Sequence, residues 1–347
     1  MFAYVGCYST PERKGKGEGI SVFHVEDPGA PWEFVQCLKT YDNPSFLRIA
    51  PDKTTLLSVH GGRSAVSAYA MDWSNGRIAL LGQADSKGNN PVDFGFTADH
   101  RHILAAHYVS GSVSILPISA GGIPGGAIQT IKIEGTPGPL GQDQPGPLPH
   151  GVTPDPTGRY LLVPDKGLDV VLVFLFEAGV LREVSRAATS PGAGPRHAVF
   201  HPKLPILYVV CELDCSVQVF DWKDGHLAHR QREPGMMPGS AEGALAAEIA
   251  ISANGRWIYS SNRGDDSIAR FAVAHDGAIG LIETTKLPGK EPRFFAIDPG
   301  GRHLHVAQQH SDSIVSFDIS PADGALSAPR VVAKVSTPVA IAFLGGG

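Results

Sequence analysis

Residues 149–174 read PHGVTPDPTGRYLLVPDKGLDVVLVF, and residues 292–318 read PRFFAIDPGGRHLHVAQQHSDSIVSFD. Both stretches contain the same phrase: a turn that includes proline, a short apolar segment, Asp-Pro-x-Gly, a second apolar segment, a polar cluster and a third apolar segment. A fourth segment follows in each copy. Because short alternating segments separated by turn residues are typical of antiparallel strands, each copy predicts one four-stranded sheet.

The phrase recurs along the whole chain at intervals of about 45 to 58 residues, a spacing typical of propeller blades. Its copies begin at Asn43-Pro44-Ser45, Asn90-Pro91-Val92, Pro149-His150, Pro195-Arg196, Ala246-Ala247, Pro292-Arg293 and Pro338-Val339. Helical periodicity is nowhere sustained, so an all-β fold is expected.

The two ends of the chain complete each other. The last copy supplies only a first strand, Val339 to Phe343, whereas the N-terminus begins with a second strand, Ala3 to Tyr8. The sequence therefore predicts a single domain over residues 1–347, a seven-bladed β-propeller with four antiparallel strands per blade. The N- and C-terminal strands share one blade, which closes the ring and removes open sheet edges.

The composition argues against some classes of partner. The chain has 41 Gly and 28 Pro among 347 residues, 18 % charged residues and a formal net charge of −5, so a nucleic-acid partner is not expected. No apolar run approaches the roughly 18 residues of a membrane span, and the N-terminus reads as a strand rather than a signal segment. We predict a cytoplasmic protein with no membrane partner. Its four cysteines are expected to be buried free thiols rather than disulfides or zinc ligands.

Two positions in each copy are expected at one end of the blade, because the chain enters the first strand and leaves the second, about fifteen residues later, at the same edge. The first position holds Ser45, Val92, His150, Arg196, Ala247, Arg293 and Val339. The later pair is His60-Gly61, His107-Tyr108, Asp165-Lys166, Cys211-Glu212, Asn262-Arg263, Gln308-Gln309 and, in the shared blade, Gly6-Cys7.

These channel-end positions differ from blade to blade, whereas the framework repeats. Long loops rich in Gly and Pro leave from the same face, at Thr10 to Glu18, Gly135 to Leu148 and Glu233 to Leu245, and are expected to rim a central pocket.

Not every polar residue at this end needs a functional role. Taken singly, His60, His107, Asp165 and Gln308 are more typical of turn residues with satisfied hydrogen bonds. His197 and Glu248 are offset by one residue, so the pleat is expected to turn them into the blade. In contrast, Arg196, Glu212 and Arg263 are costly to bury unless they face one another or a charged ligand.

At these residues the chain resembles the propeller-type lactonase family, which includes bacterial 6-phosphogluconolactonases and fungal carboxy-cis,cis-muconate lactonizing enzymes. The stretches that carry the resemblance include Pro149-His150-Gly151, Gly194-Pro195-Arg196-His197, Ser261-Asn262-Arg263-Gly264 and Pro292-Arg293-Phe294. The resemblance covers nearly the whole chain. It implies an active site around His150, Arg196, Glu212 and Arg263, with no metal and no organic cofactor.

Lactone hydrolysis needs a base that activates water and a cation or donor where the carbonyl oxygen gains charge. His150 or Glu212 would transfer the proton, and Arg196 and Arg263 suit bidentate capture of an anion. Further substrate contacts are predicted for Lys166, Asp165, Arg293, Asn262, Glu248, His107, Gln308 and His197.

The leading hypothesis is a cofactor-independent lactonase acting on a small anionic sugar lactone, most like 6-phosphogluconolactonase. The alternatives are a muconate-type lactonizing enzyme of aromatic catabolism and a non-catalytic propeller that binds a ligand or a protein. A calcium-dependent six-bladed gluconolactonase is disfavoured by the blade count. The sequence does not predict an oligomeric state.

Overall fold

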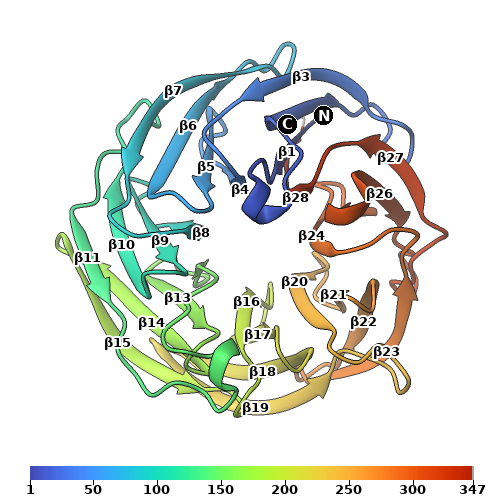
Figure 1. The fold of residues 1–347 in the computed structure, drawn as a ribbon. Helices are drawn as coiled ribbons and strands as arrows, with labels where there is room; N and C mark the ends of the chain where they lie inside the picture. The colour runs from blue at the N-terminus through green and yellow to red at the C-terminus, as the bar shows by residue number, and fades with distance from the viewer. Residues whose placement is uncertain (346–347) are drawn as a thin grey trace.

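Seven four-stranded antiparallel sheets surround a central channel in the computed structural model, which describes residues 1–345 (Figure 1). The predicted all-β propeller is confirmed. Within residues 1–345 the helical segments are three single turns of 3-10 helix, η1 (Pro11–Arg13), η2 (Gly141–Asp143) and η3 (Gln309–Ser311).

Each blade is named here by its place in the chain, and its strands are given from the channel outward. Blade 1 contains β28 (Pro338–Leu344), β1 (Phe2–Cys7), β2 (Gly19–His24) and β3 (Glu33–Lys39). Blade 2 contains β4 (Pro44–Ile49), β5 (Thr55–His60), β6 (Ala65–Met71) and β7 (Ile78–Asp85). Blade 3 contains β8 (Pro91–Phe96), β9 (His102–His107), β10 (Ser112–Pro117) and β11 (Gln129–Lys132). Blade 4 contains β12 (Thr153–Pro154), β13 (Tyr160–Asp165), β14 (Val170–Glu177) and β15 (Val180–Ala188).

The remaining three blades follow the same order. Blade 5 contains β16 (Pro195–Phe200), β17 (Ile206–Cys211), β18 (Ser216–Lys223) and β19 (His226–Pro234). Blade 6 contains β20 (Leu245–Ile251), β21 (Trp257–Arg263), β22 (Ser267–Val273) and β23 (Ile279–Lys286). Blade 7 contains β24 (Pro292–Ile297), β25 (His303–Gln308), β26 (Ser313–Asp318) and β27 (Arg330–Lys334).

The shared blade closes the ring as predicted. Strand β28 pairs with β1 in antiparallel register from Phe2 opposite Leu344 to Cys7 opposite Pro338. The strands from the two ends of the chain therefore lie side by side in one blade (Figure 1). β28 is the inner strand of this blade, so the last described strand lines the channel.

The hydrophobic core lies between neighbouring blades. Leu104 and Val113 of blade 3, for example, share one buried cluster with Leu161, Leu172 and Phe174 of blade 4. Full burial of such a side chain contributes about 1.5–3 kcal/mol, so each blade is held mainly by its two neighbours. The strand ends are thereby left to polar residues that are not needed for this packing.

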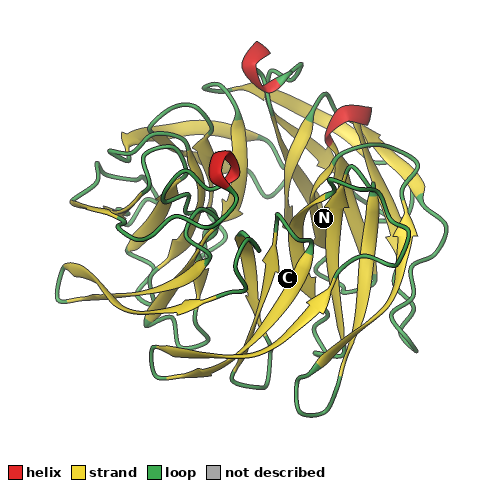
Figure 2. Cartoon of the chain, turned by 60° about the horizontal axis from the view of Figure 1, so that its bottom comes forward, coloured by secondary structure: helices red, strands yellow, loops and turns green. Residues whose placement is uncertain are grey.

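The long loops gather at one end of the channel, as predicted. They follow either a second strand or an outer strand, and both kinds of strand end on the same face. Figure 2 shows η1, η2 and η3 together on that face of the molecule. Gln144, which follows η2, donates to the carbonyl oxygen of Lys166, and Asn262 donates to the carbonyl oxygen of Gly235 in the third loop. This face is therefore the one that carries the candidate site.

The prediction that the cysteines are buried free thiols is confirmed for three of the four. Cys7, Cys211 and Cys215 are buried free thiols, but Cys37 is free and exposed. The correction has a simple cause, because Cys37 lies on the outermost strand of its blade, where every residue is exposed or only partly buried. Within residues 1–345 no helix has the length and apolar character needed to cross a membrane.

Candidate active site

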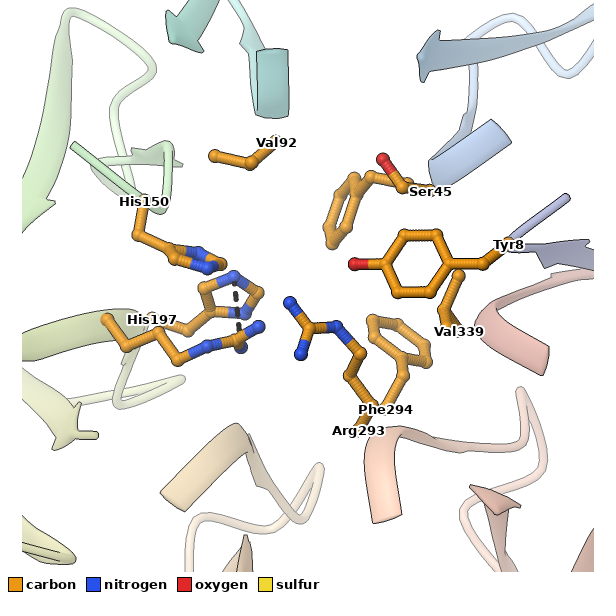
Figure 3. A pocket seen from close by; sticks show the side chains of 10 residues that line it. Tyr8, Ser45, Val92, His150, His197, Arg293, Phe294 and Val339 are labelled. Carbon is orange, nitrogen blue, oxygen red and sulfur yellow. Dashed lines mark hydrogen bonds between the residues drawn. The ribbon is translucent and has the colours of Figure 1, made fainter. Parts of the chain in front are cut away.

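The inner strands are irregular where they meet the channel. Their pairing with the second strand shifts between Pro44 and Phe46, between Pro91 and Asp93, between Pro195 and His197, and between Pro292 and Phe294. The residues left out of register are Ser45, Val92, Arg196 and Arg293. A β-bulge of this kind re-aims a side chain, and Ser45, Val92 and Arg293 point toward one cavity in Figure 3.

One pocket collects nearly all the predicted inner-strand positions. It is lined by Ser45, Val92, His150, Arg196, Arg293 and Val339, together with Tyr8, Phe46, His197 and Phe294 (Figure 3). The seventh predicted position, Ala247, contributes its carbonyl oxygen instead, which accepts a hydrogen bond from Arg196. The repeat thus identified the ring of residues around the pocket.

The predicted pairs at the ends of the second strands divide into two roles. The amide of the second member donates to the carbonyl oxygen two residues before the predicted inner-strand position, and this bond recurs for Tyr8, Gly61, Tyr108, Lys166, Glu212 and Gln309. The equivalent pair in blade 1 is therefore Cys7-Tyr8, and the predicted alignment on Gly6-Cys7 is wrong by one residue. No spacing could be counted there, because the two strands come from opposite ends of the chain.

The first members of the pairs form hydrogen bonds within or next to their own blades and do not line the pocket. Asp165 Oδ1 accepts from the backbone amides of Leu148, Gly167 and Leu168. His107 Nδ1 lies 3.3 Å from the carbonyl oxygen of Ser112. Gln308 Oε1 accepts from Ser313, and Asn262 Nδ2 donates to Gly235. His60 is bonded to the Tyr41 and Asp42 carbonyls and to Ser58 and Ser67. Substrate contact by His107, Asp165, Asn262 or Gln308 stays a prediction, for which this geometry offers no support.

Three second members of the pairs, Lys166, Glu212 and Arg263, form a buried ionic cluster with Arg196. Glu212 Oε1 accepts from Lys166 Nζ at 2.9 Å, and Glu212 Oε2 lies 3.0 Å from Arg196 Nε and 3.3 Å from Arg263 Nη2. Although burial raises the pKa of the Glu212 carboxyl, the charges of Arg263, Lys166 and Arg196 outweigh it and hold that pKa far below its usual range. The predicted convergence of Arg196, Glu212 and Arg263 is confirmed.

The pocket carries more positive than negative charge. Two cations, Arg196 and Arg293, line it, and two more, Lys166 and Arg263, share the Glu212 carboxylate with Arg196. The carboxylates beside these groups are Glu212, Glu248 and Glu291. Four cations against three carboxylates leave one positive charge uncompensated. Within residues 1–345 Arg293 forms no salt bridge, and its guanidinium carbon lies 5.4 Å from the centre of the Tyr8 ring. An anionic ligand fits this balance.

Tyr8 is a pocket residue that the sequence analysis did not single out. Its hydroxyl points into the cavity (Figure 3). The guanidinium carbon of Arg13, in the first rim loop, lies 5.2 Å from the centre of the Tyr8 ring. Burial raises the pKa of the Tyr8 phenol, but the charges of Arg293, Arg13, Arg196 and Arg263 outweigh burial and lower that pKa overall. The recurring amide bond described above is the signal that would have placed Tyr8 beside Tyr108 and Glu212.

His197 lies at the floor of the pocket, contrary to the expectation that the pleat would turn it into the blade. Its Nδ1 lies 2.9 Å from both carboxylate oxygens of Glu248, and its ring centre lies 5.2 Å from that of His150. The bulge at Arg196 resets the pleat, so two consecutive residues face the channel. Glu248 likewise sits inside a shift of register between Ala246 and Ile249.

His150 is almost fully buried beside these groups. Its ring is edge-on to Tyr108 at 5.6 Å between centres, and its Nδ1 has no hydrogen-bond partner among residues 1–345. Burial and the neighbouring Arg196 lower the pKa of His150 well below the usual value, so the ring is neutral at pH 7. Across residues 1–345 no group of three or more His, Cys, Asp or Glu side chains is arranged to hold a metal ion.

Fold and pocket together define a closed β-propeller with a cationic small-molecule site at one end of its channel. A family model described as lactonase, 7-bladed beta-propeller matches residues 2–343. The chain belongs to this lactonase family, and the predicted family and enzyme class are confirmed.

Relatives of known name agree with this assignment. A 6-phosphogluconolactonase of Bacillus subtilis is 28 % identical, covering 98 % of this chain and 97 % of that protein. A 6-phosphogluconolactonase of Erwinia tasmaniensis is 31 % identical, covering 90 % and 91 %. Among solved structures, a periplasmic gluconolactonase of Pseudomonas aeruginosa superposes with a TM-score of 0.91 at 30 % identity and covers 99 % of both chains.

Proposed function

We propose that this protein hydrolyses 6-phosphogluconolactone to the open hydroxy acid. The observation that carries the proposal is the positive charge at the pocket. Arg196 and Arg293 line its wall, Arg196 shares the Glu212 carboxylate with Arg263 and Lys166, and Arg293 forms no salt bridge within residues 1–345. The names of the relatives supply the lactone. We expect the reaction to need no cofactor, as the family resemblance implies.

The cations divide by position. Arg196 and Arg293 come from inner-strand starts and line the pocket, so we assign them to the carbonyl oxygen, which gains negative charge as water adds. Lys166 and Arg263 come from second-strand ends beside the rim loops: Gln144 of the second loop donates to the Lys166 carbonyl, and Arg263 pairs with Leu245 at the end of the third loop. We therefore assign them to the phosphate. The apolar side of the pocket, with Val92, Phe46 and Phe294, suits the carbon face of a sugar ring.

Glu212 organises the cations in this proposal and does not act as the base. Both of its oxygens are already engaged by cations, and its lowered pKa makes it a poor proton acceptor. Of the two candidates for proton transfer in the sequence analysis, Glu212 therefore becomes the less suitable.

The substrate is tested by comparing three lactones with the wild-type protein, in slightly acidic buffer and against the spontaneous rate. We expect kcat/KM for 6-phosphogluconolactone to exceed that for gluconolactone by about 10- to 100-fold, since one charged contact contributes about 1.5–3 kcal/mol. Equal values would show that the phosphate is not recognised. A higher value for a carboxylated muconolactone would assign the protein to aromatic catabolism instead.

The compartment stays a prediction. The chain was expected to be cytoplasmic, whereas the similar Pseudomonas aeruginosa structure is named a periplasmic protein. A small anionic lactone as the partner agrees with the names of the relatives.

A further inference from the structure

We propose that His197, oriented by Glu248, is the general base that activates the hydrolytic water. The inference rests on the lactone hydrolysis proposed above and assigns one step of it. It replaces both proton-transfer candidates of the sequence analysis, His150 and Glu212.

The protonation of the His197 ring follows from its two partners. Glu248 places both carboxylate oxygens 2.9 Å from Nδ1, and an ionised carboxylate only accepts hydrogen bonds, so Nδ1 carries the proton. Arg196 Nη1 lies 3.4 Å from Nε2, and a guanidinium only donates, so Nε2 carries the lone pair. Two neighbours of opposite charge thus select one tautomer, in which the basic nitrogen is the one on the side of Arg196.

Glu248 is held firmly enough to orient the ring. Its backbone amide donates to Ser261 Oγ, and its Oε1 also accepts from the amide of Ile249. The bulge in β20 lets Glu248 reach from blade 6 to the His197 side chain of blade 5. A buried carboxylate behind a histidine is the arrangement that holds a catalytic imidazole in the productive tautomer and stabilises its protonated form.

His150 has the opposite arrangement. Its Nδ1 is buried without a partner in residues 1–345, and a bare acceptor costs less there than an unsatisfied N–H group. The proton therefore resides on Nε2, which makes His150 a hydrogen-bond donor. Its lowered pKa opposes proton uptake as well. His150 is thus suited to stabilise the oxyanion or the leaving oxygen.

His197 also stands between two cavities. With Phe46 and Phe294 it lines the substrate pocket and a second cavity of about 290 Å³ on its other side. Glu248, Arg48 and Asp93 line only the second cavity. The dyad therefore has its carboxylate on the side away from the substrate, where water can solvate the carboxylate without entering the pocket.

As Arg196 turns to the lactone carbonyl oxygen, its 3.4 Å contact with His197 Nε2 is given up to the attacking water. The oxygen of this water bonds to the lactone carbonyl carbon while His197 Nε2 takes one of its protons. The tetrahedral intermediate then breaks the bond between the carbonyl carbon and the ring oxygen, and His197 returns the proton to that oxygen. The product is the open hydroxy acid, whose carboxyl proton is released to solvent.

The test is steady-state kinetics of His197→Gln and Glu248→Gln with 6-phosphogluconolactone. For His197→Gln we expect kcat to fall by about 10²–10⁴, the usual contribution of a general base, with KM changed less than about threefold. For Glu248→Gln we also expect kcat to fall, because the amide can donate to Nδ1 and favour the wrong tautomer. The fall should be smaller than for His197→Gln, since the imidazole itself is retained. His275→Gln, at an exposed turn, is the matched control and should behave like the wild type.

The outcomes separate this inference from the proposed function. If the wild type does not hydrolyse the lactone, both the proposed function and the inference that rests on it are contradicted. If the wild type is active and folded His197→Gln keeps kcat within threefold, the inference alone is overturned. If His197→Gln does not fold, Glu248→Gln and ¹⁵N-histidine spectra of the wild type decide, since the proposal requires one buried imidazole protonated at Nδ1 and unprotonated at Nε2.

Discussion

The two halves of the propeller use the same backbone for different purposes. Blades 4, 5 and 7 place His150, Arg196 and Arg293 on the pocket wall, and blade 6 has Ala247 at this position. Blades 1 to 3 place Val339, Ser45 and Val92 at the equivalent positions (Figure 3). The bulge that turns Arg196 into the channel also occurs at Ser45 and Val92. The bulge therefore sets the direction in which a side chain points, and the type of side chain determines what chemistry it can perform.

This asymmetry is useful for a ligand with one charged end. The arginines that line the pocket come from blades 5 and 7, so an anion is held mainly on that side, and the carbon skeleton can lie against Phe46, Val92 and Val339 of the other half. A ring with cations at all seven positions would repel itself and would hold an anion in many orientations.

The largest expected effect comes from substitutions of arginines in the charged half. Arg196→Lys should lower kcat by about two to three decades, because lysine keeps the charge but loses the forked geometry that stabilises developing negative charge. Arg263→Lys should mainly raise KM, because the bidentate contact with the phosphate is lost. Activity on 6-phosphogluconolactone and melting temperature should be measured on the same variants. Arg230→Lys, on the exposed outer strand β19, is the control and should leave kcat unchanged. Normal activity with a lowered melting temperature would make both arginines structural.

The fold could be predicted almost entirely because the repeat is a local signal. Each blade must pack against its neighbours in the same way, so its turns and apolar segments recur, and the inner strands begin at the predicted prolines in blades 1, 2, 3, 5 and 7. The closing strand was expected at Val339 to Phe343 and spans Pro338–Leu344.

The site could be predicted only in part, because its details depend on the register between strands. A bulge is a property of a pair of strands and leaves no mark in either one, so His197 and Glu248 were expected to turn into the blade. Which member of each strand-end pair faces the channel also depends on pairing. The charged residues Arg196, Glu212 and Arg263 were found because burying them singly is costly, and that argument needs no register.

A smaller effect is expected on the uncharged half, at Tyr8. Its hydroxyl is the polar group of blade 1 that points into the pocket, and it lies in the positive field of Arg13 and Arg293. Tyr8→Phe should lower kcat/KM by about 10- to 100-fold if the hydroxyl donates to a charged group of the substrate. Tyr41→Phe, half-exposed on the adjacent loop, is the control. Unchanged kinetics for Tyr8→Phe would confine the chemistry to blades 4 to 7.

The smallest effect concerns stability and separates the two members of a strand-end pair. Lys166 faces the site, whereas Asp165 is buried in the blade, and burial raises the pKa of the Asp165 carboxyl to about 7. Its unfolded value is about 3.9, so the folded state binds the proton more tightly and the wild type loses stability as the pH rises from about 4 to about 7. All three amides donate to Oδ1, and Oδ2 has no partner within residues 1–345.

Asp165→Asn can therefore keep every hydrogen bond while removing a buried charge. At pH 8 we expect its free energy of unfolding to exceed that of the wild type by about 1–3 kcal/mol, and the difference should shrink as the pH falls toward 4. Asp265→Asn is the matched control with the opposite sign. Although burial raises the pKa of Asp265, its hydrogen bonds to Lys286 and Ser267 lower that pKa overall. The Asp265 carboxylate therefore stabilises the fold above its unfolded pKa, and this contribution is lost as the pH falls through the folded pKa. Urea unfolding at pH 5 and pH 8 measures both, and a loss of stability in Asp165→Asn at pH 8 would show that the charge itself holds the loop.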